Sequence, residues 1–155
     1  MKNLTKLGVL AVDFLILDQI SKYLAKEFLD NPVQVFGEFF KFEYVENRGI
    51  AFSIPMPYLV IIISNIFLIG LIIYLAKEEL DLSEKKAVIP MALLVAGGLG
   101  NLIDRLFHGF VVDFISIWKY PFFNLADAYI IAAVLLLILF YGKIKRVKNT
   151  KTGMK

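Results

Sequence analysis

Hydrophobic positions in this chain form long stretches without charge rather than short alternating runs. Three such stretches, residues 58–76, 87–103 and 128–142, contain no Asp, Glu, Lys or Arg. Each approaches the length of about 20 residues that a helix needs to cross the hydrocarbon core of a bilayer. The pattern predicts three membrane-spanning helices, at about residues 58–76, 87–107 and 125–142.

A fourth apolar stretch, at about residues 4–24, is apolar along most of its length but carries Asp13, Asp18 and Lys22. Lys2 and Lys6 precede its uncharged run, which begins at Leu7, as basic residues precede the apolar region of a cleaved signal peptide. Asp13 breaks that region, however, and no small-residue cleavage site followed by a polar domain comes after it. We therefore expect a retained helix and a total of four membrane spans.

Between the first two spans, aromatic and charged residues alternate. Phe40, Phe42 and Tyr44 are separated by Lys41 and Glu43, the period of two that is typical of a strand with one apolar face. A small sheet on the membrane surface is the structure that this predicts. The predicted class is an α-helical integral membrane protein, a single membrane domain over residues 1–155, with four transmembrane helices and a small extracytoplasmic β-sheet.

Lysine and arginine are concentrated before the first span, between the second and third, and after the fourth. Cytoplasmic loops carry an excess of basic residues, so both termini are expected in the cytoplasm. The basic tail at residues 143–155 is expected to lie against anionic lipid. The segments at about residues 25–57 and 108–124 then face the extracytoplasmic side.

Composition restricts the chemistry. The chain is 59% hydrophobic and 20% charged, against roughly 45–50% apolar and about 25% charged in an average soluble domain. It has no cysteine and one histidine, His108, which excludes disulfides, thiolate metal sites, cysteine nucleophiles and an H-E-x-x-H zinc site. We expect no metal and no cofactor. The net charge is +3, but the lysines do not lie where a protein that binds a nucleic-acid groove would need them. We therefore expect no nucleic-acid partner.

Charged side chains at the centre of a span cost about 2.5–3.5 kcal/mol each, so each needs a partner or a function. Asp18 and Lys22, in the motif DQISK, occupy positions i and i+4 on one face of the first span. The structural interpretation is a pair that neutralises itself and fixes this helix against its neighbours. The alternative is a desolvated lysine that acts as a base for a serine nucleophile.

Amides and a second charged pair follow later in the chain. Asn47 and Gly49, in ENRGIAF, are first of all turn formers, although the amide of Asn47 could instead bind a peptide backbone. In the third span Asn101 and Arg105 are at positions i and i+4. The adjacent Asp104 and Arg105 are candidates for mutual neutralisation at the interface.

Two aspartates are expected at the outer surface. Asp113 lies in the apolar run VVDF with no neighbouring cation, and Asp127 follows Asn124 in FNLAD at the start of the last span. Asn124 at the N-cap with an acid at N3 is also a plausible helix start. The topology returns both aspartates to one membrane depth. Two carboxylates in a half-apolar pocket share a proton, because both cannot ionise cheaply, and such a pair can activate water against an amide.

Taken together, the motifs DQISK, ENRGIAF, GNLIDR, VVDF and FNLAD resemble, in this order, those of the lipoprotein signal peptidase family, also called signal peptidase II. The resemblance covers nearly the whole chain. It implies a membrane aspartic endopeptidase that removes signal peptides from prolipoproteins by cleaving on the N-terminal side of a diacylglyceryl-modified cysteine. It also implies a bacterial cytoplasmic (inner) membrane location, an active site on the extracytoplasmic side, and inhibition by the peptide antibiotic globomycin.

Carried onto this chain, the resemblance implies that Asp113 and Asp127 are the catalytic pair. Further matching positions bind substrate or order the site, namely Asn47, Gly49, Asn101, Arg105 and Asn124, or support it, namely Asp18, Lys22 and Asp104. The implied partners are diacylglyceryl-modified prolipoproteins and membrane lipids, and we expect the chain to act as a monomer.

Two other functions stay open on the residues alone. One is a Ser-Lys membrane peptidase that uses Lys22 with Ser21 or Ser53, although Ser21 adjoins Lys22 and so points away from it on a helix. The other is a non-enzymatic four-helix membrane protein, such as a small transporter subunit or an assembly factor, in which the acids are caps and ion pairs.

Overall fold

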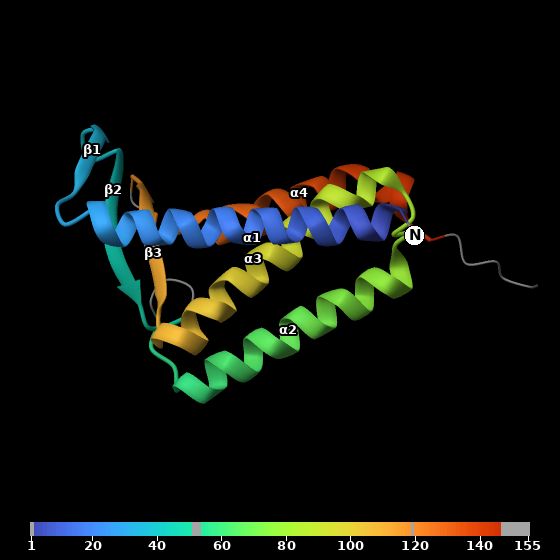
Figure 1. Cartoon of the computed structure of the whole chain (residues 1–155), viewed down its shortest axis with the longest axis horizontal. Coiled ribbons are helices and arrows are strands. Elements are labelled where there is room, and N and C mark those ends of the chain that lie inside the picture. Colours follow the sequence, from blue (N-terminus) through green and yellow to red (C-terminus); the bar gives the residue numbers. More distant parts are fainter. Residues whose placement is uncertain (1, 51–53, 119, 147–155) are drawn as a thin grey trace, which may run out of the picture.

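The computed structural model describes residues 2–50, 54–118 and 120–146. Over these residues the chain forms a bundle of long helices with a three-stranded sheet at one end (Figure 1). The elements are α1 (Lys2–Phe28), β1 (Val33–Phe36), β2 (Phe40–Asn47), α2 (Tyr58–Glu79), α3 (Lys85–His108), β3 (Val111–Ile117) and α4 (Leu125–Ile144). Ser53 of the alternative serine site and residues 147–155 of the basic tail lie outside the described residues.

Three helices of the described chain, α2, α3 and α4, are long and apolar enough to cross a membrane, which confirms the three uncharged stretches as helices. The helix α1, with 27 residues, is of comparable length but carries Asp13, Asp18 and Lys22. Figure 1 shows α1 running beside α3 in the same direction, with α2 and α4 running in the opposite direction. The central helix is α3, which contacts each of the other three.

Small residues allow α3 to occupy this central position. A methyl group added at Gly97 would lie 2.5 Å from the backbone oxygen of Ala126 and 2.8 Å from Cγ1 of Ile130 on α4. One added at Gly100 would collide with the carboxylate of Asp18 on α1. Glycine at these two positions therefore permits close helix contact, the role that small residues have in membrane helix packing.

The sheet has the order β1-β2-β3, with both pairs antiparallel. The strand β2 covers the alternating segment that predicts a strand. The strand β3 has no such signal, because five of its seven residues are buried and the alternation of apolar and polar positions is lost. It begins directly after α3, where Gly109 adopts a left-handed conformation with φ 81° and ends the helix.

After β3 the chain returns to the sheet. The backbone N–H of Phe123 donates to the carbonyl of Ile115 at 3.0 Å, and the N–H of Ile115 donates to the carbonyl of Phe123 at 2.9 Å. This pairing brings Asn124, the N-cap of α4, beside the residues around Asp113. The turn at Gly109 and the pairing at Phe123 together bring the start of α4 next to β3.

Replacing Gly97 by Ala is expected to destabilise the protein by about 1–3 kcal/mol, because the added methyl group meets backbone of α4 that cannot rotate away. Thermal unfolding in detergent measures this as a lower Tm. The matched control is Gly8→Ala on α1, where an added methyl group has nothing within 4 Å. Equal Tm values for the two variants would contradict the packing described for α3.

Candidate active site

Asp113 lies in the middle of β3 with only 3% of its surface exposed. Its Oδ2 accepts a hydrogen bond of 2.9 Å from Nδ2 of Asn47, at the end of β2. Its Oδ1 accepts one of 2.7 Å from Nδ2 of Asn124. Both oxygens of this buried carboxylate are thus bound by amide N–H groups.

Asp127 is the third residue of α4 and is held in a similar way. Its Oδ1 accepts from Nδ2 of Asn101 on α3 at 2.7 Å, and its Oδ2 accepts from the backbone N–H of Asn124 at 3.2 Å. The backbone N–H of Asp127 in turn donates to Oδ1 of Asn124 at 3.0 Å, which completes a capping box. The expected helix cap is therefore present, and the same Asn124 also binds Asp113 through its other amide atom.

Each of the three Asn side chains that donate to the aspartates has a fixed amide orientation. Its oxygen accepts a hydrogen bond from a group that can only donate. The oxygen of Asn47 accepts the backbone N–H of Gly49 at 3.0 Å. The oxygen of Asn124 accepts the backbone N–H of Asp127, and that of Asn101 accepts from Nζ of Lys22 at 3.0 Å. Because each oxygen is engaged in this way, each NH₂ group is directed at a carboxylate.

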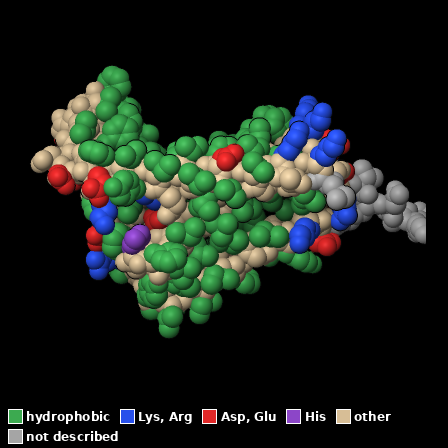
Figure 2. Space-filling model, viewed as in Figure 1, with side chains coloured by type: hydrophobic (Ala, Val, Ile, Leu, Met, Phe, Trp, Pro, Cys, Tyr) green, Lys and Arg blue, Asp and Glu red, His purple; other side chains and the backbone are tan. Residues whose placement is uncertain are grey.

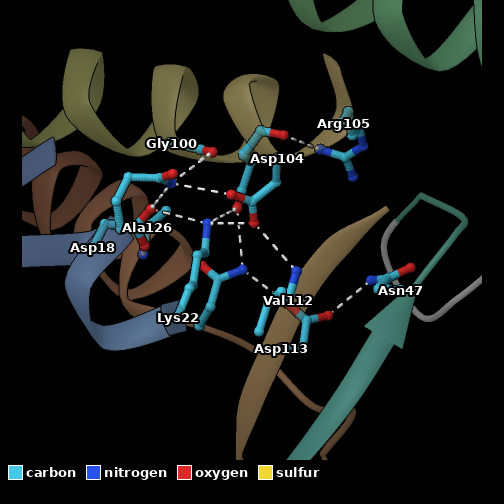
Figure 3. A network of polar contacts seen from close by, with 12 residues as sticks. Asp18, Lys22, Asn47, Gly100, Asp104, Arg105, Val112, Asp113 and Ala126 are labelled. Carbon is cyan, nitrogen blue, oxygen red and sulfur yellow. Dashed lines mark hydrogen bonds and ion pairs between the residues drawn. The ribbon is translucent and has the colours of Figure 1, made fainter. Parts of the chain in front are cut away.

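The ammonium of Lys22 lies between two carboxylates (Figure 3). Its Nζ is 2.9 Å from Oδ2 of Asp18 and 3.0 Å from Oδ2 of Asp104, and all three side chains are at most 4% exposed. The i, i+4 pair expected within α1 is therefore present. The expected neutralisation of Asp104 by Arg105 was wrong, because neighbours on a helix point in different directions and Lys22 reaches Asp104 from another helix.

Arg105 connects α3 to the turn after β2. Its guanidinium donates to the backbone oxygens of Asn101 and Gly49, each at 3.3 Å. The hydroxyl of Tyr58, at the start of α2, donates to the backbone oxygen of Arg105 at 2.7 Å. The turn expected at Asn47 and Gly49 is thus fixed against the C-terminal end of α3.

Burial raises the pKa of Asp113 to about 6. The negative charge of the nearby Asp127 raises that pKa too, whereas the hydrogen bonds from Asn47 and Asn124 lower it, because they stabilise the ionised form. Asp113 can therefore hold a proton near neutral pH.

Both aspartates line one cavity of about 730 Å³. Asn47, Asn101 and Arg105 line it together with them. The remaining lining is mostly apolar and comes from α2, α3, α4 and the segment after β3, for example Leu68, Ile69, Ile72, Leu94, Val95, Phe122 and Ile130. Figure 2 shows how much of the outer surface of the helices is also hydrophobic. The two carboxylates thus stand at the polar part of an otherwise apolar cavity.

Other chemistries find less support in the geometry. The hydroxyl of Ser21 donates to the backbone oxygen of Asp18 at 2.7 Å, while the Lys22 ammonium contacts Asp18, Asp104 and Asn101. Among the residues that the structure describes, no three His, Cys, Asp or Glu side chains are placed to share a metal ion.

Two site residues were not expected from the sequence. Gln19, within the motif DQISK, donates through Nε2 to Asp18 at 3.1 Å and to Asp104 at 3.0 Å. Asn65 of α2 lines the cavity, and its buried Nδ2 has no hydrogen-bond partner among the described residues. Both are amides within helices that are otherwise largely apolar, and this position in the sequence was the available signal for them.

The chain is similar over most of its length to proteins of one known family. The family model described as Signal peptidase (SPase) II matches residues 10–142. A lipoprotein signal peptidase of Caldicellulosiruptor bescii is 39% identical over 132 residues, covering 83% of this chain and 85% of the relative. One from Clostridium novyi is 35% identical over 135 residues, covering 81% of this chain and 90% of the relative. A solved bacterial membrane enzyme is 28% identical with a TM-score of 0.76, covering 96% of this chain and 93% of that protein.

Replacing Asn47 by Ala is expected to raise the pKa of Asp113 above its value of about 6, because a donor that stabilises the ionised carboxylate is lost. Infrared titration of the protonated carboxyl band, with Asp113→Asn to identify the signal, measures the shift. Arg48→Gln is the control, since Arg48 is exposed and pairs with Glu46 rather than Asp113. An unchanged or lower pKa in Asn47→Ala would contradict the role given to this amide.

Proposed function

Because the chain belongs to the signal peptidase II family, we propose that it removes signal peptides from prolipoproteins with a water molecule activated between Asp113 and Asp127. The observation that carries this mechanism is the shared cavity, in which each of the four carboxylate oxygens accepts an amide N–H. Amide donors fix the carboxylates without neutralising them, so one can act as a base and the other as an acid.

We assign Asp127 as the base and Asp113 as the protonated acid. Asp127 lies in the first turn of α4, where the partial positive charge of the helix N-terminus stabilises an anion. Asp113 lies within the sheet at 3% exposure, and burial favours its neutral form. The surroundings of Asp127 therefore suit a base and those of Asp113 suit an acid.

In the first step, Asp127 accepts a proton from water while the water oxygen attacks the carbon of the scissile amide. Asp113 donates its proton to the carbonyl oxygen, which gives a neutral tetrahedral intermediate. In the second step, the C–N bond breaks as Asp127 returns its proton to the leaving nitrogen. Asp113 takes the proton of one hydroxyl as the new carboxylic acid forms, so both aspartates regain their starting states.

The substrate implied is a peptide whose cysteine carries a diacylglyceryl group. The apolar walls that α2, α3 and α4 give to the cavity fit acyl chains, and the carboxylates at its polar part fit the adjacent peptide bond. The buried acyl chains supply binding through apolar contact, so few side-chain contacts to the peptide are needed. Globomycin, a peptide inhibitor expected from the family resemblance, would compete for the same cavity.

We further propose that α1 is a fourth membrane span and that both termini are cytoplasmic. Its length and its position beside α3 support the first point (Figure 1). Lys2 and Lys6 lie at the start of α1 and Lys85 begins α3, and Figure 2 shows Lys and Arg side chains at the end of the helices distant from the sheet, which supports the second. The site then faces the extracytoplasmic side of the bacterial inner membrane, and the protein acts as a monomer.

Asp113→Asn and Asp127→Asn are each expected to reduce cleavage by more than about 10³-fold, because each removes one of two coupled proton-transfer groups. The assay uses the purified protein in detergent with a diacylglyceryl-modified prolipoprotein. Asp81→Asn, in the turn between α2 and α3, is the matched control. Full activity of either site variant, with Tm unchanged, would exclude the dyad. Loss confined to Lys22→Ala in a folded protein would favour the serine mechanism.

The pH dependence follows from the assignment of the proton to Asp113. Its raised pKa of about 6 means that the protonated acid is lost as pH rises through this value, so kcat/KM should fall on the alkaline side with an apparent pKa near 6 or above. Measuring Tm over the same range separates this fall from unfolding. A value of kcat/KM that rises with pH and remains high to about pH 9 would contradict the assignment.

A further inference from the structure

Two backbone N–H groups beside the aspartates are bound by other acidic side chains. The N–H of Val112, the residue before Asp113, donates to Oδ2 of Asp104 at 3.2 Å. The N–H of Ala126, the residue before Asp127, donates to Oδ1 of Asp18 at 2.9 Å. Each member of the pair is thus preceded by a residue whose backbone is bound by a buried carboxylate. We call these two contacts the backbone clamps.

The two clamps are joined to each other. Figure 3 shows the Lys22 ammonium between Asp18 and Asp104, 2.9 Å and 3.0 Å from their Oδ2 atoms. Nε2 of Gln19 makes a second connection, at 3.1 Å to Asp18 and 3.0 Å to Asp104. Lys22 and Gln19 both belong to α1, so one helix connects the clamp on β3 to the clamp on α4.

Stability alone is a poor explanation for this arrangement. The exposed fractions of Asp18, Lys22 and Asp104 are 0%, 3% and 2%, and a buried ion network is often no more stabilising than apolar side chains of the same size. The group formed by Asp18, Lys22 and Asp104 can instead fix the relative position of β3 and α4. This position matters because Asp113 lies on β3 and Asp127 on α4. A displacement of about 1 Å at a reacting group can cost about 100-fold in rate.

We propose that Asp18, Gln19, Lys22 and Asp104 are positioning residues that set the separation of Asp113 and Asp127 through the backbone clamps. This rests on the proposed function, since the separation matters only if both carboxylates act on one water. Lys22 has a second effect through Asn101, whose amide it orients toward Asp127. The motif DQISK then acts on the reaction through the backbone of two other elements.

The test compares Asp104→Leu with Asp104→Asn. Both remove the charge and keep a side chain of similar size, but only Asn retains an oxygen that can accept the N–H of Val112. Asp104→Leu should lower kcat about 10- to 100-fold below Asp104→Asn, with KM changed less than about 2-fold, because substrate contacts are retained while the reacting groups shift. Asp18→Leu and Asp18→Asn form the same comparison for Ala126.

A double-mutant cycle tests the connection between the clamps. If Lys22 and Gln19 couple them, the combined effect of Asp18→Asn and Asp104→Asn on kcat differs from the product of the two single effects by more than about 3-fold. Multiplicative effects would show two independent contacts and would overturn the coupling. Lys86→Met is the control for loss of a lysine, since Lys86 lies over the ring of Phe140, away from the dyad.

Hydrogen exchange distinguishes positioning from folding. The amides of Val112 and Ala126 should exchange faster in the Leu variants than in the Asn variants, while Tm and the exchange of other helix amides agree within each pair. If a Leu variant does not fold, the Asn variant decides, with a several-fold lower kcat at unchanged KM expected. Equal kcat for Leu, Asn and wild type would overturn the proposal, as would a loss of kcat that matches the loss of folded protein.

Failure of the proposed function would look different. In that case wild type would not cleave the prolipoprotein, or Asp113→Asn would remain active, whatever the Leu and Asn pairs do. The proposal about the backbone clamps fails alone if wild type is active, Asp113→Asn is inactive, and the matched pairs have the same kcat.

Discussion

Burial of the Lys22 ammonium between Asp18 and Asp104 is the interaction on which the rest of the site depends. An unpaired buried charge is strongly destabilising, so the network requires α1 and α3 to be in contact, and Gly100 leaves room for the carboxylate of Asp18 between them. The same carboxylates bind backbone of β3 and α4. One electrostatic requirement thus brings together the elements that carry the reacting groups.

Amide groups, rather than charged side chains, donate the hydrogen bonds to the two aspartates. A cation in direct contact would favour ionisation of both carboxylates, and an ionised pair has no acid for the carbonyl oxygen. Asn47 and Asn124 instead bind Asp113 as neutral donors, and its pKa remains raised. Lys22 acts on the pair through another residue, because its ammonium orients Asn101. The same ammonium also pairs with the carboxylates of Asp18 and Asp104.

The helices could be predicted from the sequence because uncharged stretches of spanning length leave few alternatives. The strand β3 could not, because its residues are buried in the sheet and so lack alternation. The partner of Asp104 was assigned wrongly for a related reason, since contacts within one helix can be read from spacing but contacts between helices cannot. Asn124 is both a helix cap and a site residue, because its oxygen caps α4 while its nitrogen binds Asp113.

In the proposed mechanism, Asp113 and Asp127 act together on one water and one carbonyl group. The most direct test is an experimental structure of the protein bound to a lipopeptide in which a hydroxyl-bearing carbon replaces the scissile carbonyl. We expect this hydroxyl to lie within hydrogen-bond distance of carboxylate oxygens of both Asp113 and Asp127. A hydroxyl bound away from the pair, in contact with only one aspartate or with a serine, would contradict it.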